Sequence, residues 1–200
     1  MRSCVIESSD VRDFFNELIQ MQPLMGPRER SRQPGHYQFD WLESADESRI
    51  SVMGFSGGAA ASAYVAARDE RISNLVLCAC PARFSISSLG RTPEEFLDQC
   101  RRVGTIRDSG FPRSVQKWAE HFQQISPIDC ISQISPRPLL IIHGDKDETI
   151  PPKHASWLYG MARDPRRELV MVPGGGHRLR SNEMAMKSAL EWLKRVNGMA

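Results

Sequence analysis

From residue 50 onward, short apolar runs alternate with segments of helical pattern, and this alternation limits the possible folds more than any other feature. The apolar runs cover residues 50–55, 74–80, 138–143 and 168–172. The helical patterns cover residues 59–68, 152–162 and 182–196. Continuous apolar strands separated by helices indicate a parallel sheet that is covered on both faces. We therefore predict an α/β fold with a mostly parallel sheet flanked by helices.

One stretch, residues 81–136, is too long for a simple crossover between two strands. It contains two helix-like pieces, residues 92–103 and 112–124. The first piece starts with a capping hydroxyl, a proline and two acids, Thr92-Pro93-Glu94-Glu95, which is typical of a helix N-terminus. We interpret the stretch as an inserted helical lid beside the active site. A helical decoration without a role in substrate access is the alternative.

The first 49 residues form an atypical, shortened N-terminal head. We expect a short strand over residues 3–6 and a helix from Ser9 to about Met21, followed by a loop rich in Pro, Arg and Gly over residues 23–34. A length of 200 residues suits one domain with its own core. The expected organisation is therefore a single domain over residues 1–200.

A strand-to-helix turn around Ser56 gives the strongest functional signal. The turn reads Gly54-Phe55-Ser56-Gly57-Gly58, which matches G-x-S-x-G between an apolar strand and an Ala-rich helix. Such a tight turn strains the serine backbone, and we expect the glycines two residues on either side to avoid backbone clashes. Ser56 then stands at the carboxyl edge of the sheet as a nucleophile, and the N–H of Gly57 points at a developing oxyanion. A glycine-rich turn with a capping serine is the alternative.

A serine hydroxyl is a poor nucleophile without an adjacent base, so a histidine is needed at the same edge. His177 follows a glycine-rich loop just after the last strand, and we predict that it is the general base. His143 ends an apolar strand, which favours a packed, hydrogen-bonded role. We expect His154 at the start of a surface helix, His121 in a lid helix and His36 in the head.

The acid is expected at another strand end, ahead of the histidine. The loop His143-Gly144-Asp145-Lys146-Asp147 offers two carboxylates. The later one, Asp147, resembles the pattern H-G-x-x-D-x-x-[VI]-P, which Ile150 and Pro151 continue. Asp145 is the alternative acid, or it braces the loop by accepting backbone N–H groups. We predict that Asp147 orients His177.

These three segments, in the order Ser, Asp, His, resemble the α/β-hydrolase superfamily. The closest branch looks like the dienelactone hydrolases and prolyl oligopeptidases, because the run from Ser126 to Gly144 is similar to that branch's approach to its acid loop. The resemblance covers about residues 50–196. It implies a serine hydrolase that cleaves a carboxylic ester or related acyl bond through an acyl-enzyme, with neither a metal nor an organic cofactor. Peptidases, thioesterases and acyltransferases share the same constellation.

The head, residues 1–49, departs from this resemblance. Members of the superfamily usually place several strands before the nucleophile, and one of them ends in a His-Gly loop that supplies a second oxyanion N–H. No such segment is evident in residues 1–49. A truncated, catalytically weak or non-catalytic binding or assembly protein is therefore the alternative function. Missing strands would leave an open sheet edge, so we also predict homo-oligomerisation through that edge.

Charge and hydropathy exclude other classes of partner. The formal net charge is +2, which gives no case for a nucleic-acid surface. No apolar run is long enough to span a bilayer, and the first residues lack the apolar stretch of a signal peptide. We therefore expect a cytoplasmic protein whose partner is a small acyl substrate.

The cysteines are five in number and dispersed, which argues against a disulfide framework. Cys78 and Cys80 lie in one apolar run, and in a continuous strand both thiols would face the same side. No further metal-ligating residues stand near them in the sequence. We predict that they are buried, inert thiols.

Overall fold

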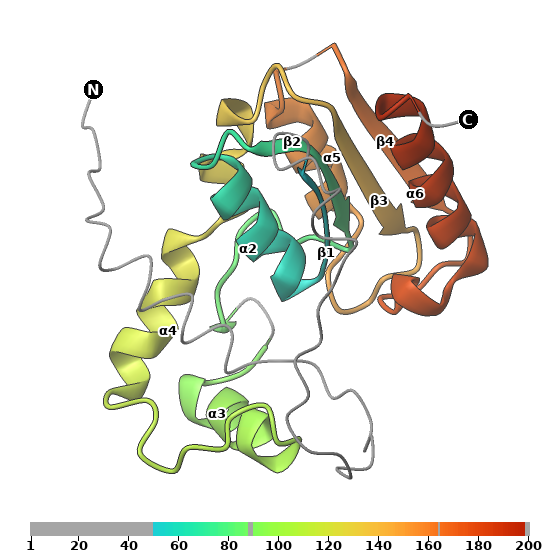
Figure 1. Cartoon of the computed structure of the whole chain (residues 1–200). Coiled ribbons are helices and arrows are strands. Elements are labelled where there is room, and N and C mark those ends of the chain that lie inside the picture. Colours follow the sequence, from blue (N-terminus) through green and yellow to red (C-terminus); the bar gives the residue numbers. More distant parts are fainter. Residues whose placement is uncertain (1–49, 88–89, 164, 199–200) are drawn as a thin grey trace, which may run out of the picture.

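The computed structural model describes residues 50–87, 90–163 and 165–198, so the expectations for the head lie outside the described residues. Four strands form one parallel sheet in the order β1-β2-β3-β4, as Figure 1 shows. Their bounds are Ile50–Phe55, Ile72–Cys78, Leu139–Gly144 and Arg167–Val172. The predicted α/β fold with a parallel sheet is confirmed, with strand bounds that differ from the expected ones by at most two residues.

The register of the strands brings their carboxyl ends to one edge of the sheet. Phe55 at the end of β1 pairs with Cys78 at the end of β2. Gly144 at the end of β3 pairs with Val172 at the end of β4. The loops that follow β1, β3 and β4 therefore emerge side by side, and we call these three loops the rim.

Helices cover both faces of the sheet (Figure 1). Helices α2, Gly57–Ala66, and α5, Lys153–Met161, pack on one face, where they share a buried apolar cluster with the strands. Helix α6, Glu183–Val196, packs on the other face through a second cluster. Each covering helix thus removes one face of the strands from water, which stabilises the sheet by the hydrophobic effect.

The stretch 81–136 carries α3, Pro93–Arg102, and α4, Val115–Gln124, which Figure 1 shows away from the sheet, beyond α2. Two short 3-10 turns follow, Pro127–Asp129 and Ile131–Gln133. The predicted start of α3 is confirmed: the Thr92 side chain accepts the Glu95 N–H, and the Glu95 side chain accepts the Thr92 N–H. Helix α4 begins later than expected, because Ser114 caps it by accepting the Lys117 N–H.

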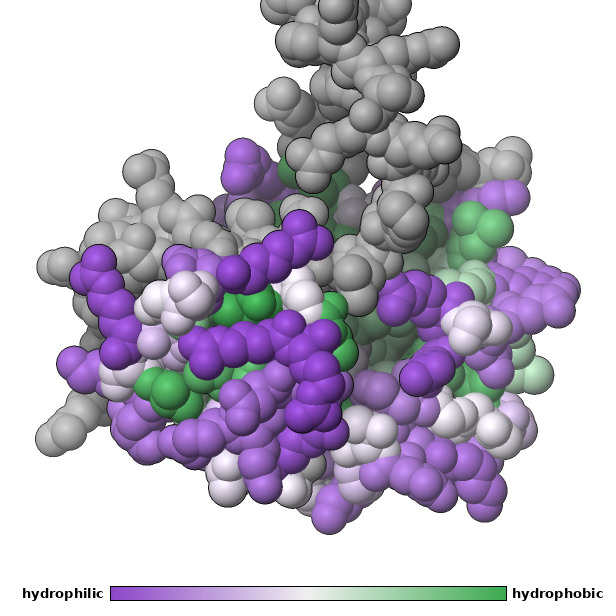
Figure 2. Space-filling view, turned by 90° about the horizontal axis from the view of Figure 1, so that it is seen from below, coloured by the Kyte–Doolittle hydropathy of each residue, from purple (hydrophilic) through white to green (hydrophobic). Residues whose placement is uncertain are grey.

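The interior of this stretch is an apolar cluster that it shares with α2. Buried members include Phe84, Trp118 and Phe122, and Phe96 and Phe111 pack against them. Figure 2 shows the molecule from below, where most of the face is hydrophilic and hydrophobic residues emerge between polar ones on the side of α3 and α4. The stretch is therefore folded against α2, around a core distinct from the two clusters on the faces of the sheet.

The turn after β2 corrects one expectation. The strand ends at Cys78, and Ala79 has a positive φ of 49°, so the chain turns before Cys80. Cys78 packs in the α6-side cluster, whereas Cys80 packs in the cluster of α2 and α5. The two thiols thus do not face the same side. Both are buried, and burial raises the pKa of Cys78 to about 12 and the pKa of Cys80 well above its ordinary value.

Among the described residues, no helix has the length and apolar character needed to cross a membrane.

Candidate active site

Ser56 occupies a strained turn between β1 and α2. Its backbone angles are φ 53° and ψ −124°, and its N–H donates to the carbonyl of Cys78 at 2.9 Å. A Cβ at Gly54 would lie 2.6 Å from the Cα of Ala59, so only glycine fits there. At Gly58, by contrast, a Cβ would meet no atom within 4 Å. The expected role of the flanking glycines is therefore confirmed for Gly54 and wrong for Gly58.

Gly57 is the first residue of α2, so its N–H lies in the helical turn that lacks intrahelical acceptors. The positive end of the helix dipole lies at the same place. A Cβ at Gly57 would lie 3.0 Å from Cζ of Phe84, so the ring of Phe84 closes one side of this residue. At Gly57, a backbone N–H without an acceptor in its own helix thus lies next to the ring of Phe84.

The structure brings the three predicted site residues together at the rim. The Ser56 Oγ lies 2.9 Å from Nε2 of His177, and Nδ1 of His177 lies 2.9 Å from Oδ2 of Asp147. We call this chain of contacts from Ser56 through His177 to Asp147 the relay. The His177 side chain is 24% exposed and that of Asp147 is 0% exposed, so the relay runs from the surface into the interior of the protein. With Nδ1 protonated toward the carboxylate, Nε2 accepts the hydroxyl proton of Ser56.

The carboxylate of Asp147 is held from both sides. Its Oδ1 accepts the N–H groups of Thr149 at 2.9 Å and Ile150 at 2.8 Å, and its Oδ2 faces His177. A buried carboxylate needs such donors, because an unpaired charge in the interior is costly. Asp147 is thus fixed as a hydrogen-bond acceptor for the imidazole.

The loops after β3 and β4 are joined at close range. A Cβ at Gly144 would lie 2.1 Å from the carbonyl oxygen of Gly175, so glycine is required where the loops meet. The Lys146 N–H donates to the same carbonyl at 2.9 Å. Asp145 accepts the Gly174 N–H at 2.7 Å, which is the bracing role considered for it. These contacts set the position of His177 relative to Asp147.

His143 is fully buried behind Asp147, as expected for a packed, hydrogen-bonded histidine. Its Nε2 lies 2.8 Å from the carbonyl of Ile150 and 3.4 Å from Oδ2 of Asp147. Within the described residues, its Nδ1 has no hydrogen-bond partner. Burial lowers the pKa of His143. The side chain therefore donates from Nε2 as a neutral imidazole and supports the end of the relay.

The other histidines lie outside the relay. His154 is not a simple surface residue, since its Nδ1 accepts the Ala82 N–H at 3.0 Å and its ring packs on Trp157. That contact connects the start of α5 to the loop after β2, which the sequence did not reveal. His121 lies in α4 as expected, and His36 lies outside the described residues.

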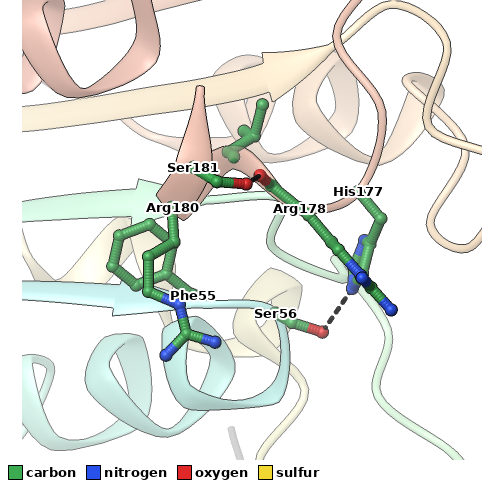
Figure 3. Close-up of a pocket in the computed structure, with 7 residues that line it drawn as sticks. Phe55, Ser56, His177, Arg178, Arg180 and Ser181 are labelled. Carbon is green, nitrogen blue, oxygen red and sulfur yellow. Dashed lines mark hydrogen bonds between the residues drawn. The ribbon is translucent and has the colours of Figure 1, made fainter. Parts of the chain in front are cut away.

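A cavity of about 450 Å³ opens beside Ser56 and His177. Its remaining lining comes from Phe55 and from the segment after the histidine: Arg178, Leu179, Arg180 and Ser181. Figure 3 shows the two arginine side chains on opposite sides of the Ser56 hydroxyl. The sequence analysis does not identify these residues, although an apolar residue between two arginines directly after the histidine is a pattern that could have indicated them. Among the described residues, no group of three or more His, Cys, Asp or Glu side chains is placed to hold a metal ion.

Comparison with known proteins places the chain in a family. The prolyl oligopeptidase family model matches residues 40–200. The chain belongs to the prolyl oligopeptidase family. A curated relative, the Escherichia coli (strain K12) uncharacterized protein YfhR, is 47% identical over 47 residues. That alignment covers 24% of this chain and 16% of YfhR, so the chain matches only a small part of this relative's length.

Solved structures agree with the α/β-hydrolase fold of this prolyl oligopeptidase family member. A thermophilic esterase from Thermogutta terrifontis is 21% identical with a TM-score of 0.55, and the match covers 78% of this chain and 68% of that chain. The esterase domain of a Rhodothermus marinus protein is 19% identical with a TM-score of 0.54, and the match covers 77% of this chain and 62% of that chain. These likenesses show that the chain shares the α/β-hydrolase fold.

Proposed function

We propose that the protein is a serine hydrolase that cleaves a carboxylic ester or a related acyl bond. Ser56 is the nucleophile, His177 the general base and Asp147 the orienting acid. The observation that carries the proposal is the continuous chain of two 2.9 Å contacts from the Ser56 hydroxyl through the imidazole to the buried carboxylate. The esterases that share the fold agree with this class of substrate.

The first half of the reaction forms the acyl-enzyme. Ser56 Oγ attacks the substrate carbonyl carbon as Nε2 of His177 takes the hydroxyl proton, and the carbonyl electrons move onto oxygen. Asp147 stabilises the imidazolium that forms, since its carboxylate already accepts a hydrogen bond from the Nδ1–H group of His177. His177 then passes the proton from Nε2 to the leaving group as the acyl–oxygen bond breaks.

The oxyanion is expected to lie at the start of α2. There the N–H of Gly57 has no intrahelical acceptor, and the helix dipole favours negative charge. In the second half of the reaction, His177 activates a water molecule, which attacks the acyl carbon and releases the acid. The proton then returns to Ser56, so the enzyme is regenerated without another reactant.

Turnover of 4-nitrophenyl acetate and butyrate by the full chain tests this proposal. We expect Ser56→Ala to reduce kcat by at least about 10⁴-fold. Ser156→Ala is the matched control, because Ser156 is an exposed serine of α5 outside the relay. Turnover that exceeds the uncatalysed rate and is equal in Ser56→Ala and the parent would overturn the assignment. A parent chain that does not exceed the uncatalysed rate would favour the non-catalytic alternative.

A further inference from the structure

Among the described residues, the lining of the cavity beside Ser56 includes two arginines and no carboxylate. Its seven lining residues include Arg178 and Arg180, and both side chains are exposed. The acid of the relay is buried behind His177, where backbone N–H groups and the imidazole already satisfy it. The formal net charge of the whole chain is only +2, so this pair is a local concentration of positive charge.

The backbone under the two arginines is firmly held. Leu179, which lies between them, is 1% exposed and packs in the α6-side cluster. The segment Leu179–Ser181 forms a 3-10 turn, and the Ser181 hydroxyl donates to the carbonyl of Arg178 at 3.0 Å, as Figure 3 shows. Because the central leucine points into the core, its two neighbours are directed outward, toward the cavity.

Both arginines line the cavity that Ser56 and His177 also line. In the view of Figure 3, the ends of the two arginine side chains lie on opposite sides of the Ser56 hydroxyl. Within the described residues, no hydrogen bond or ion pair occupies either guanidinium. By contrast, Arg195 and Arg71 are engaged by Glu168 and Asp69, respectively. Both cavity arginines thus have donors that none of the described residues uses.

Arginine side chains in this setting have a specific ligand chemistry. A guanidinium stays charged at all accessible pH values and offers a planar set of donors that matches carboxylate and phosphate oxygens. A cationic cavity wall also raises the local concentration of anionic substrates. A neutral substrate would use neither property.

We propose that this cavity binds an anionic group of the substrate. On the proposed function, on which this inference rests, the substrate is an acyl compound that carries a carboxylate or phosphate on its acyl or leaving-group side. Arg178 and Arg180 would hold that group while Ser56 attacks the carbonyl. The two residues are specificity determinants and take no part in proton transfer.

The test compares esters matched in shape but not in charge. On the acyl side, mono-4-nitrophenyl succinate is compared with 4-nitrophenyl butyrate, and on the leaving-group side, 4-acetoxybenzoate is compared with 4-acetoxybenzamide. We expect a higher kcat/KM for the anionic member of at least one pair. The preference should shrink as the salt concentration rises toward about 1 M, because ions screen exposed charges. The pair that shows the preference identifies which side of the substrate faces the arginines.

Arginine variants test whether the preference for anionic esters arises from the cavity. Arg178→Gln and Arg180→Gln should each reduce the anionic-to-neutral ratio of kcat/KM by about 3- to 10-fold, because exposed charge pairs are worth roughly 1 kcal/mol. The double variant should abolish the preference. Lys194→Gln removes an exposed positive charge near the end of α6 and should keep the parent ratio.

The outcomes separate the two proposals. Ser56-dependent hydrolysis without preference for either anionic ester, or an unchanged ratio in the double arginine variant, would overturn this inference and leave the serine hydrolase intact. Hydrolysis that persists in Ser56→Ala would overturn the proposed function itself.

Discussion

The rim of the sheet and the stretch 81–136 are stabilised by different kinds of contact. At the rim, the loops after β3 and β4 approach so closely that a Cβ at Gly144 would lie 2.1 Å from the carbonyl oxygen of Gly175. In the stretch 81–136, aromatic rings pack around Phe122, whose ring centroid lies 5.1 Å from those of Phe84 and Trp118. The geometry of the rim therefore depends on close backbone contacts that a single added Cβ would disrupt. The stability of the stretch 81–136 depends instead on the packing of large apolar side chains.

Helix α2 belongs to both regions. Ala59 and Ala63 pack in the cluster against the sheet, and Ala60 and Tyr64 pack in the cluster of the stretch 81–136. Small side chains allow a helix to be buried on two sides, which accounts for its Ala-rich sequence. The helix that starts at the candidate nucleophile thus also joins the two regions.

The largest expected effect lies at the rim. Asp147→Asn keeps the size of the side chain but removes the charge that stabilises the imidazolium, and it favours the wrong tautomer of His177. We expect kcat for an ester to fall by about 10⁴-fold while the free energy of unfolding changes much less. Steady-state kinetics and urea unfolding measure the two quantities. A fall in kcat of less than about tenfold would remove Asp147 from the relay.

The next effect lies in the stretch 81–136. Phe122→Ala deletes a ring that is 3% exposed and should lower the free energy of unfolding by about 3–5 kcal/mol. Gln123→Ala, on the exposed side of the same helix, is the control. If the comparison of the two regions holds, the folded Phe122→Ala protein keeps a kcat within about threefold of the parent. A loss of kcat similar to that of Asp147→Asn would show that the regions are not independent.

A pair of glycine variants tests the turn around Ser56. Gly54→Ala should destabilise the protein by about 1–3 kcal/mol or more, since its Cβ would meet backbone atoms of α2. Gly58→Ala places a methyl group in open space and should stabilise α2 by up to about 1 kcal/mol. Urea unfolding compares them. Equal destabilisation by the two substitutions would contradict the geometry of the turn.

The smallest effect concerns pH. Burial lowers the pKa of His143 in the folded chain, so below about pH 6.5 the unfolded chain takes up a proton that the folded chain refuses. This contribution to stability is present above the unfolded pKa and is lost as pH falls toward the folded pKa. His143→Gln keeps an N–H donor without the titration and should flatten this part of the pH dependence. An unchanged slope in urea unfolding between pH 7 and pH 5 would contradict it.

The sequence predicted the parts of the fold that depend on local pattern. Continuous apolar runs located all four strands, and G-x-S-x-G located the turn at Ser56 because only a few residue types fit so tight a connection. The close approach of Asp147 to His177 followed from their positions after neighbouring parallel strands.

The remaining features depend on contacts between distant segments. The turn at Ala79 directs Cys78 and Cys80 to different sides of the sheet. The sequence does not predict this turn, because Ala79 lies within an unbroken apolar run. The bond from Ala82 to His154 joins segments that are far apart in the sequence, so spacing could not reveal it. The open space at Gly58 likewise depends on what packs nearby. Oligomerisation through an open sheet edge stays a prediction, which sedimentation velocity can test.

Labelling with a fluorophosphonate tests the central claim most directly, because the probe forms a covalent bond only with an activated serine. The account predicts one adduct per chain by intact mass, located at Ser56 by peptide mapping and absent from Ser56→Ala. It also predicts undiminished labelling of Ser156→Ala. Equal labelling of the parent and Ser56→Ala, or none in a folded parent chain, would contradict it.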